Sequence, residues 1–166
     1  MGQLASVNLN ITSWELIILL FLIGGGFLLG ILIGKNKIFL MLLGSYISSA
    51  ILSVVPIKKM FPNFFIQEEN FVVLIILYLV LIGIVYFIFS RTRKKARNRG
   101  FWSIFQIFFY ALFLVGIVLS MVFSFLPKDL ISEFSSLTLN IFNTPLARTL
   151  WFVIPLIFIG IFRRKD

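Results

Sequence analysis

The stretch LIILLFLIGGGFLLGILIG, residues 16–34, contains no charged side chain and decides the class of fold. A helix needs about 20 consecutive apolar residues to cross about 30 Å of hydrocarbon, because each residue advances the helix by about 1.5 Å. Further stretches of this kind lie at residues 38–57, 71–90 and 101–126. The sequence therefore predicts an all-α, polytopic integral membrane protein in which residues 1–166 form a single membrane domain.

The composition excludes a water-soluble globule and most enzyme chemistry. Hydrophobic residues make up 60% of the 166 residues and charged residues 13%, whereas a soluble domain has about 25% charged residues. The chain has no cysteine and no histidine, so disulfides, thiolate nucleophiles and the commonest general base are excluded. We also find no paired carboxylates, phosphate-binding loop or nucleophile beside a base. We therefore expect a protein that is not an enzyme and that uses neither a cofactor nor a metal.

The charge balance is strongly basic. Fifteen Lys and Arg residues stand against six Asp and Glu residues, and the formal net charge is +9. Basic residues of membrane proteins collect on cytoplasmic loops, where they set the topology and meet anionic headgroups. We therefore expect the lipid bilayer, and no nucleic acid, to be the partner of these charges.

A fifth apolar segment, residues 148–162, is shorter than a standard span. Arg148 at its start can extend its side chain to the interface and lengthen it. Five spans with the N-terminus outside place most of the basic residues on the cytoplasmic side. The alternative is four spans with the last segment on the membrane surface, and it distributes the basic residues almost equally between the two sides of the membrane. The sequence therefore favours five spans, with the C-terminus in the cytoplasm.

Small residues recur at a helix-packing spacing in three of the predicted spans. Helices associate in lipid where small side chains let the backbones approach closely. The serine hydroxyls among them can bond the carbonyl four residues back on the same helix, so they need no ligand. The predicted packing residues are Gly26, Gly30 and Gly34 in the first span, Gly44 and Ser48 in the second, and Gly116, Ser120 and Ser124 in the fourth.

Residues 128–142 carry apolar side chains at helical spacing, among them Phe134, Leu137 and Ile141. An amphipathic helix of this kind lies in the headgroup layer with its apolar side toward the acyl chains. We therefore expect one interfacial amphipathic helix over 128–142 on the outer surface. Lipid is its first expected contact, and a partner protein is the alternative.

The loop RTRKKARNRG, residues 91–100, is the densest cluster of charge in the chain. Each basic residue close to an anionic membrane surface contributes about 1 kcal/mol to binding. The cluster therefore serves to bind anionic lipid headgroups or to fix the topology. Its basic residues are Arg91, Arg93, Lys94, Lys95, Arg97 and Arg99.

Ionisable residues are absent from the interior of the four longer spans. Such a residue would indicate a substrate or proton pathway. Glu15 stands at the outer boundary of the first span, and Gln106 is the one strongly polar residue at depth. A proton relay is therefore not predicted.

Residues 13–126 resemble the CvpA family, small membrane proteins named for colicin V production. The resemblance begins with Trp14 and Glu15 before the first apolar run and continues through Gly26 and Gly30 to a basic turn at 35–37. It extends through Gly44 in the second span to Pro56. The basic loop between the third and fourth spans and the amphipathic segment after the fourth also look like that family.

The chain departs from the family pattern in three places. Leu29 precedes Gly30 where the family tends to carry an Arg-Gly pair, and no acidic residue follows. The family's Asp-Arg and repeated-glycine stretch before the fourth span is reduced to Arg99 and Gly100, and a fifth span is extra.

The resemblance implies an accessory or scaffold role in toxin production and export, or in envelope homeostasis, in a bacterial inner membrane. It implies no catalytic residues. We expect an envelope protein or a second copy of the chain as the protein partner. The alternative function is an oligomeric pore or small transporter subunit lined by the glycine and serine faces.

Overall fold

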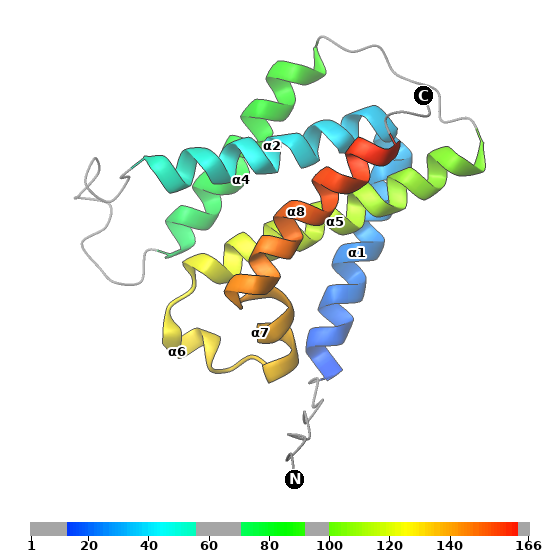
Figure 1. The fold of residues 1–166 in the computed structure, drawn as a ribbon. Helices are drawn as coiled ribbons and strands as arrows, with labels where there is room; N and C mark the ends of the chain where they lie inside the picture. Colours follow the sequence, from blue (N-terminus) through cyan, green and yellow to red (C-terminus); the bar gives the residue numbers. More distant parts are fainter. Residues whose placement is uncertain (1–12, 56–70, 92–99, 163–166) are drawn as a thin grey trace.

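The computed structural model describes residues 13–55, 71–91 and 100–162. Within these ranges every regular element is an α-helix, and none is a strand (Figure 1). The helices are α1 (Ser13–Ile33), α2 (Lys35–Val54), α4 (Phe71–Ser90), α5 (Phe101–Phe125), α6 (Lys128–Ile131), α7 (Ser136–Phe142) and α8 (Pro145–Phe162). The predicted all-α fold is confirmed.

Four of these helices, α1, α2, α4 and α5, are long and apolar enough to cross a membrane. They correspond to the four longer spans predicted from the sequence. The pair α7 and α8 meets the same requirement only together, and the two helices are bent by 49° relative to each other. By length and composition, the described chain is therefore a multi-pass membrane protein with four spans, or five when the bent pair counts as one.

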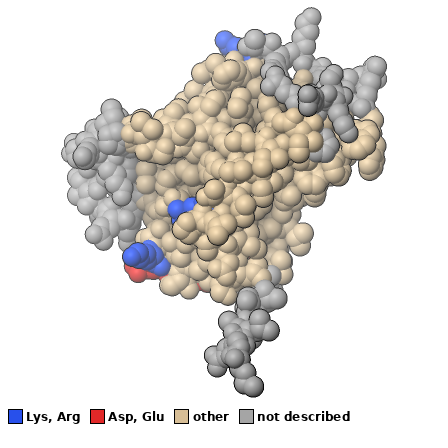
Figure 2. Space-filling view, viewed as in Figure 1, with Lys and Arg blue, Asp and Glu red and all other residues tan. Residues whose placement is uncertain are grey.

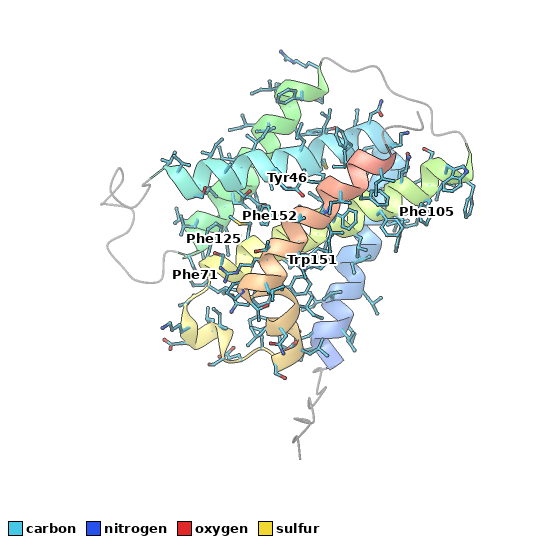
Figure 3. All side chains as sticks on the ribbon, viewed as in Figure 1. Tyr46, Phe71, Phe105, Phe125, Trp151 and Phe152 are labelled. Carbon is cyan, nitrogen blue, oxygen red and sulfur yellow. The ribbon has the colours of Figure 1, made fainter. Side chains whose placement is uncertain are left out.

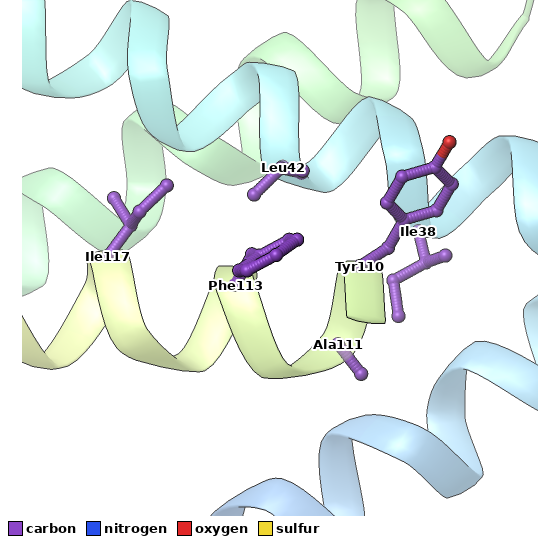
Figure 4. Packing of buried hydrophobic residues seen from close by; sticks show 6 residues of the cluster. All are labelled: Ile38, Leu42, Tyr110, Ala111, Phe113 and Ile117. Atoms are coloured by element: carbon purple, nitrogen blue, oxygen red, sulfur yellow. The ribbon is translucent and has the colours of Figure 1, made fainter. Parts of the chain in front are cut away.

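The helix α5 lies at the centre of the bundle. It packs against α1, α2 and α8, while α2 also packs along α4 (Figure 1). The core between α2 and α5 joins Ile38 and Leu42 of α2 to Tyr110, Phe113 and Ile117 of α5 (Figure 4). Residues buried inside the molecule make up 44% of the α5 span but only 6% of the α1 span and 11% of the α4 span. Helices whose apolar side chains remain on the outside suit an environment of acyl chains.

Two glycines form the turns that lead into α2 and α5. Gly34 and Gly100 both have a φ of 91°, a left-handed conformation that glycine adopts without steric cost. Gly34 alone separates α1 from α2. This corrects the prediction that Gly34 extends the packing face of Gly26 and Gly30, because the residue lies in the break between the two helices.

The segment 128–142 differs from the single interfacial helix expected from its spacing. It forms two short helices, α6 and α7, separated by residues 132–135. The hydroxyl of Ser132 donates to the carbonyl of Asp129, and the hydroxyl of Ser135 accepts a hydrogen bond from the backbone N–H of Thr138. Serine side chains that bond the local backbone compete with helical hydrogen bonds, so they end α6 and begin α7.

Candidate functional site

Four of the predicted packing glycines, Gly26, Gly30, Gly44 and Gly116, lie at helix contacts. A Cβ atom added at Gly30 would lie 2.7 Å from Ile107 Cγ2, and one added at Gly26 would lie 3.3 Å from Val115 Cγ2. Both contacts are with α5. A Cβ atom at Gly44 would lie 3.4 Å from a backbone carbonyl oxygen of α4. The structure thus brings α1 onto α5 and α2 onto α4 through these three glycines.

Gly116 makes the closest approach. A Cβ atom added there would lie 2.2 Å from the ring of Trp151 on α8. The indole is fixed in place, because its Nε1–H donates to the carbonyl of Ile141 at 2.8 Å and its ring stacks on Phe142 at 5.6 Å between centroids. Gly116 is therefore the position on α5 where α7 and α8 dock.

The three predicted serines have three different environments. Ser48 is fully buried, and its hydroxyl has no hydrogen-bond partner among the described residues. Ser120 is also buried, and its hydroxyl donates to the carbonyl of Phe142 on α7 at 3.1 Å instead of to its own helix. Ser124 is exposed and accepts a hydrogen bond from Arg148 Nη1 at 3.4 Å.

Ser124 and Arg148 lie in a pocket of about 520 Å³ between α2, α5 and α8. Tyr46, Phe152 and Phe125 lie where these three helices meet (Figure 3). The hydroxyl of Tyr46 donates to the carbonyl of Phe152 at 2.6 Å, and the two rings meet edge to face, so the α2 wall is fixed to the α8 wall. The other lining residues are Ser49, Ala50, Leu52, Ser53 and Met121.

Arg148 supplies the only charge among the described residues that line this pocket. Its side chain is half-buried, its Nη2 donates to the side-chain oxygen of Asn143, and its Nη1 donates to Ser124. Its Nε is buried and has no hydrogen-bond partner within ranges 13–55, 71–91 and 100–162. The pocket thus combines an apolar wall with a guanidinium that is not neutralised by any described carboxylate. Such an arrangement can hold an anion, but it provides no general base.

A further polar contact between distant parts of the chain involves Glu15. The carboxylate of Glu15 in the first turn of α1 is buried and accepts hydrogen bonds from the backbone N–H of Ser135 at 2.8 Å, the Ser135 hydroxyl and the Thr138 hydroxyl. These groups form the start of α7. An apolar pocket of about 250 Å³ lies beside them, with Trp14 and Phe134 in its wall.

Sequence reasoning placed Glu15 at the outer boundary but missed this contact. The available signal was a single acidic residue at the start of α1 together with the Ser135 and Thr138 hydroxyls at helix-capping spacing. Nothing in the spacing, however, joins two segments 120 positions apart.

The basic loop after α4 is described only at its first residue. Arg91 is exposed, and its guanidinium lies over the ring of Phe87 at 4.6 Å. The remaining basic residues of this predicted lipid-binding or topology cluster, Arg93, Lys94, Lys95, Arg97 and Arg99, lie outside the described residues. On the face shown in Figure 2, the charged side chains of the described residues form small separate patches among uncharged ones.

A metal centre is not formed by the residues that the structure describes, because no three acidic side chains come together there. The chain matches no protein-family model, no curated protein and no solved structure. The resemblance to the CvpA family therefore stays a prediction.

Proposed function

We propose that this chain is a non-catalytic protein of the bacterial cytoplasmic membrane that acts as an accessory or scaffold subunit. In this proposal the N-terminus is outside and the C-terminus is in the cytoplasm. The resemblance of residues 13–126 to the CvpA family suggests the process, which is toxin production and export or envelope homeostasis. The partner is an envelope protein or a second copy of the chain.

The observation that carries the proposal is the burial of most of the small-residue positions inside a single chain, whereas Ser124 is exposed. Ser48 and Ser120 are almost completely shielded from solvent, and Gly44 and Gly116 face α4 and Trp151. A pore lined by these faces would have to expose them to water between subunits. Their position supports a packing role, and thus a scaffold in preference to the oligomeric pore.

The polar side chains also support a rigid unit. Hydrogen bonds from Tyr46 and Ser120 end on carbonyls of α8 and α7, so they join the last helices to α2 and α5, and the bond from Trp151 to the Ile141 carbonyl joins α8 to α7. The outer faces of α1 and α4 remain apolar, with Phe21 78% exposed and Phe87 58% exposed. Apolar faces on span-length helices are available to lipid and to partner helices.

Solute flux separates the scaffold from the pore. We would reconstitute the purified protein in sealed vesicles loaded with a small fluorescent ion indicator, together with the Ser48→Ala and Ser120→Ala variants. The scaffold proposal predicts a leak no faster than that of protein-free vesicles for all three proteins. A leak that requires the protein and changes with either serine would establish the pore instead.

Partner contact can be measured directly in the native membrane. A photoreactive amino acid at Phe21 or Phe87 should give a discrete protein adduct, and one at the buried Ile117 should not. An adduct of twice the chain's mass would identify a second copy as the partner. Adducts with lipid alone at both exposed positions would contradict a scaffold role for these faces.

A further inference from the structure

We propose that the pocket between α2, α5 and α8 binds one anionic lipid, with the lipid phosphate on Arg148 and the first part of an acyl chain against the apolar wall. This site is additional to the proposed scaffold function and does not depend on it. It is also separate from the basic loop after α4, to which the sequence assigns headgroup binding.

The unused hydrogen-bonding capacity of Arg148 is the first reason. A guanidinium has five N–H donors in a planar fork. In this protein Nη1 and Nη2 each donate one hydrogen bond, and the buried Nε donates none to any described residue. A half-buried guanidinium with only neutral hydrogen-bond partners among the described residues is stabilised further by an anion. Phosphate oxygens fit the fork in a bidentate manner.

One hydroxyl of the pocket, that of Ser124, adds a second hydrogen-bond donor. Tyr46, Ser49 and Ser53 already donate to the carbonyls of Phe152, Tyr46 and Ala50. The hydroxyl of Ser124 accepts from Arg148 but donates to no described residue. Its proton can therefore point to the same phosphate that the guanidinium binds, so the two side chains form one anion site.

The rest of the pocket suits an acyl chain better than a water-soluble anion. Ala50, Leu52, Met121 and Phe125 are apolar, and a volume of about 520 Å³ exceeds what one phosphate group needs. An acyl chain can pack against these apolar side chains, whereas a free phosphate would leave most of the pocket unfilled. The apolar lining beside one cation is therefore the reason for choosing a lipid over free phosphate.

Thermal unfolding of the full chain in a neutral detergent tests the proposal. We would titrate the protein with phosphatidylglycerol, with phosphatidylcholine and with inorganic phosphate. A ligand that binds only the folded state raises the Tm, and saturation at about 100 times the Kd corresponds to a rise of about 5 °C or more for a chain of this size. We expect that rise with phosphatidylglycerol alone.

Two substitutions of equal charge change identify the site. Arg148→Gln should abolish the response to phosphatidylglycerol, whereas Lys128→Gln, which removes an exposed cation on α6, should keep it. Arg148→Lys should keep part of the response, because the charge remains but the fork is lost. If Arg148→Gln fails to fold, Ser124→Ala provides the second variant and should weaken the response several-fold.

Three results would overturn the proposal. Equal Tm shifts with phosphatidylcholine and phosphatidylglycerol would show that the charge of the lipid is irrelevant. An equal shift with inorganic phosphate would replace the lipid by a free anion. A full response in both Arg148→Gln and Ser124→Ala would place the bound lipid elsewhere. None of these results bears on vesicle leak or on the photoreactive adducts, so the scaffold proposal can fail or hold independently.

Discussion

At the scale of single residues, Gly116 is the position most sensitive to one added methyl group. In Gly116→Ala the new Cβ would lie 2.2 Å from a Trp151 ring that is held by a hydrogen bond and by stacking. Overpacking of this kind costs about 1–3 kcal/mol, and we expect a lower Tm in detergent. Gly83→Ala is the matched control on α4, where a Cβ meets nothing within 4 Å. It should stabilise the helix by about 0.5–1 kcal/mol. Equal Tm changes for the two variants would contradict the described α5–α8 contact.

Two buried serines should respond to alanine in opposite directions. Ser120→Ala removes a hydrogen bond to the Phe142 carbonyl and leaves that buried acceptor without its partner, which costs about 1–3 kcal/mol. Ser48→Ala removes a buried hydroxyl that has no described partner, so the free energy of unfolding should stay the same or rise. Thermal unfolding of both variants in the same detergent measures the difference. A loss for Ser48→Ala as large as that for Ser120→Ala would mean that the Ser48 hydroxyl is hydrogen-bonded in the membrane.

At the scale of secondary-structure elements, the contact between α1 and α7 depends on Glu15. The Glu15 carboxylate accepts hydrogen bonds from the Ser135 N–H, the Ser135 hydroxyl and the Thr138 hydroxyl. In Glu15→Gln the side chain becomes an uncharged amide with a single acceptor oxygen, so these three hydrogen bonds are weakened or lost. We expect a loss of about 1–3 kcal/mol and faster proteolysis at residues 132–135. Glu133→Gln, at an exposed acidic residue of the same segment, is the control. Equal proteolysis rates in wild type and Glu15→Gln would show that α7 is held by other contacts.

The sequence predicts the elements well where apolar length decides them and less well where local hydrogen bonds do. The predicted third span 71–90 coincides with α4, because charged or polar residues bound it on both sides. The α2 helix begins at Lys35, ahead of the predicted residue 38, since one left-handed glycine completes the turn and the lysines can enter the helix. The break at 132–135 was not predicted, because the apolar spacing of Phe134 and Leu137 continues through it and only the Ser132 and Ser135 bonds interrupt it.

At the scale of the whole molecule, the sequence identifies which residues allow close packing but not which helices they join. The spacing of Gly26 and Gly30 predicts a tight contact, yet the partner α5 follows only from the three-dimensional arrangement. The pocket was missed for the same reason. Arg148 was expected only to extend toward the interface, whereas it meets Ser124 of α5 and faces Tyr46 of α2 across the pocket. Contacts between segments far apart in sequence carry no periodic signal.

The contact of Glu15 with Ser135 also constrains the topology, because it places the start of α1 and the α6–α7 segment at the same end of the bundle (Figure 1). An even number of crossings must therefore separate them, and the four helices α1, α2, α4 and α5 supply it. The side of the C-terminus then depends only on whether α8 crosses. We predict that reporter fusions after Ser90 and at Asp166 will show cytoplasmic activity, and that a fusion after Pro145 will show periplasmic activity.

A periplasmic signal at Asp166 would mean that α8 returns to the outer surface at its 49° bend with α7, and the chain would have four spans. The C-terminal basic residues would then lie outside, against the usual distribution of Lys and Arg. Under both outcomes Arg148 stays at the end of the bundle where α5 ends, because its side chain contacts Ser124 there. The reporter result therefore decides the number of spans without moving the lipid pocket to the other leaflet.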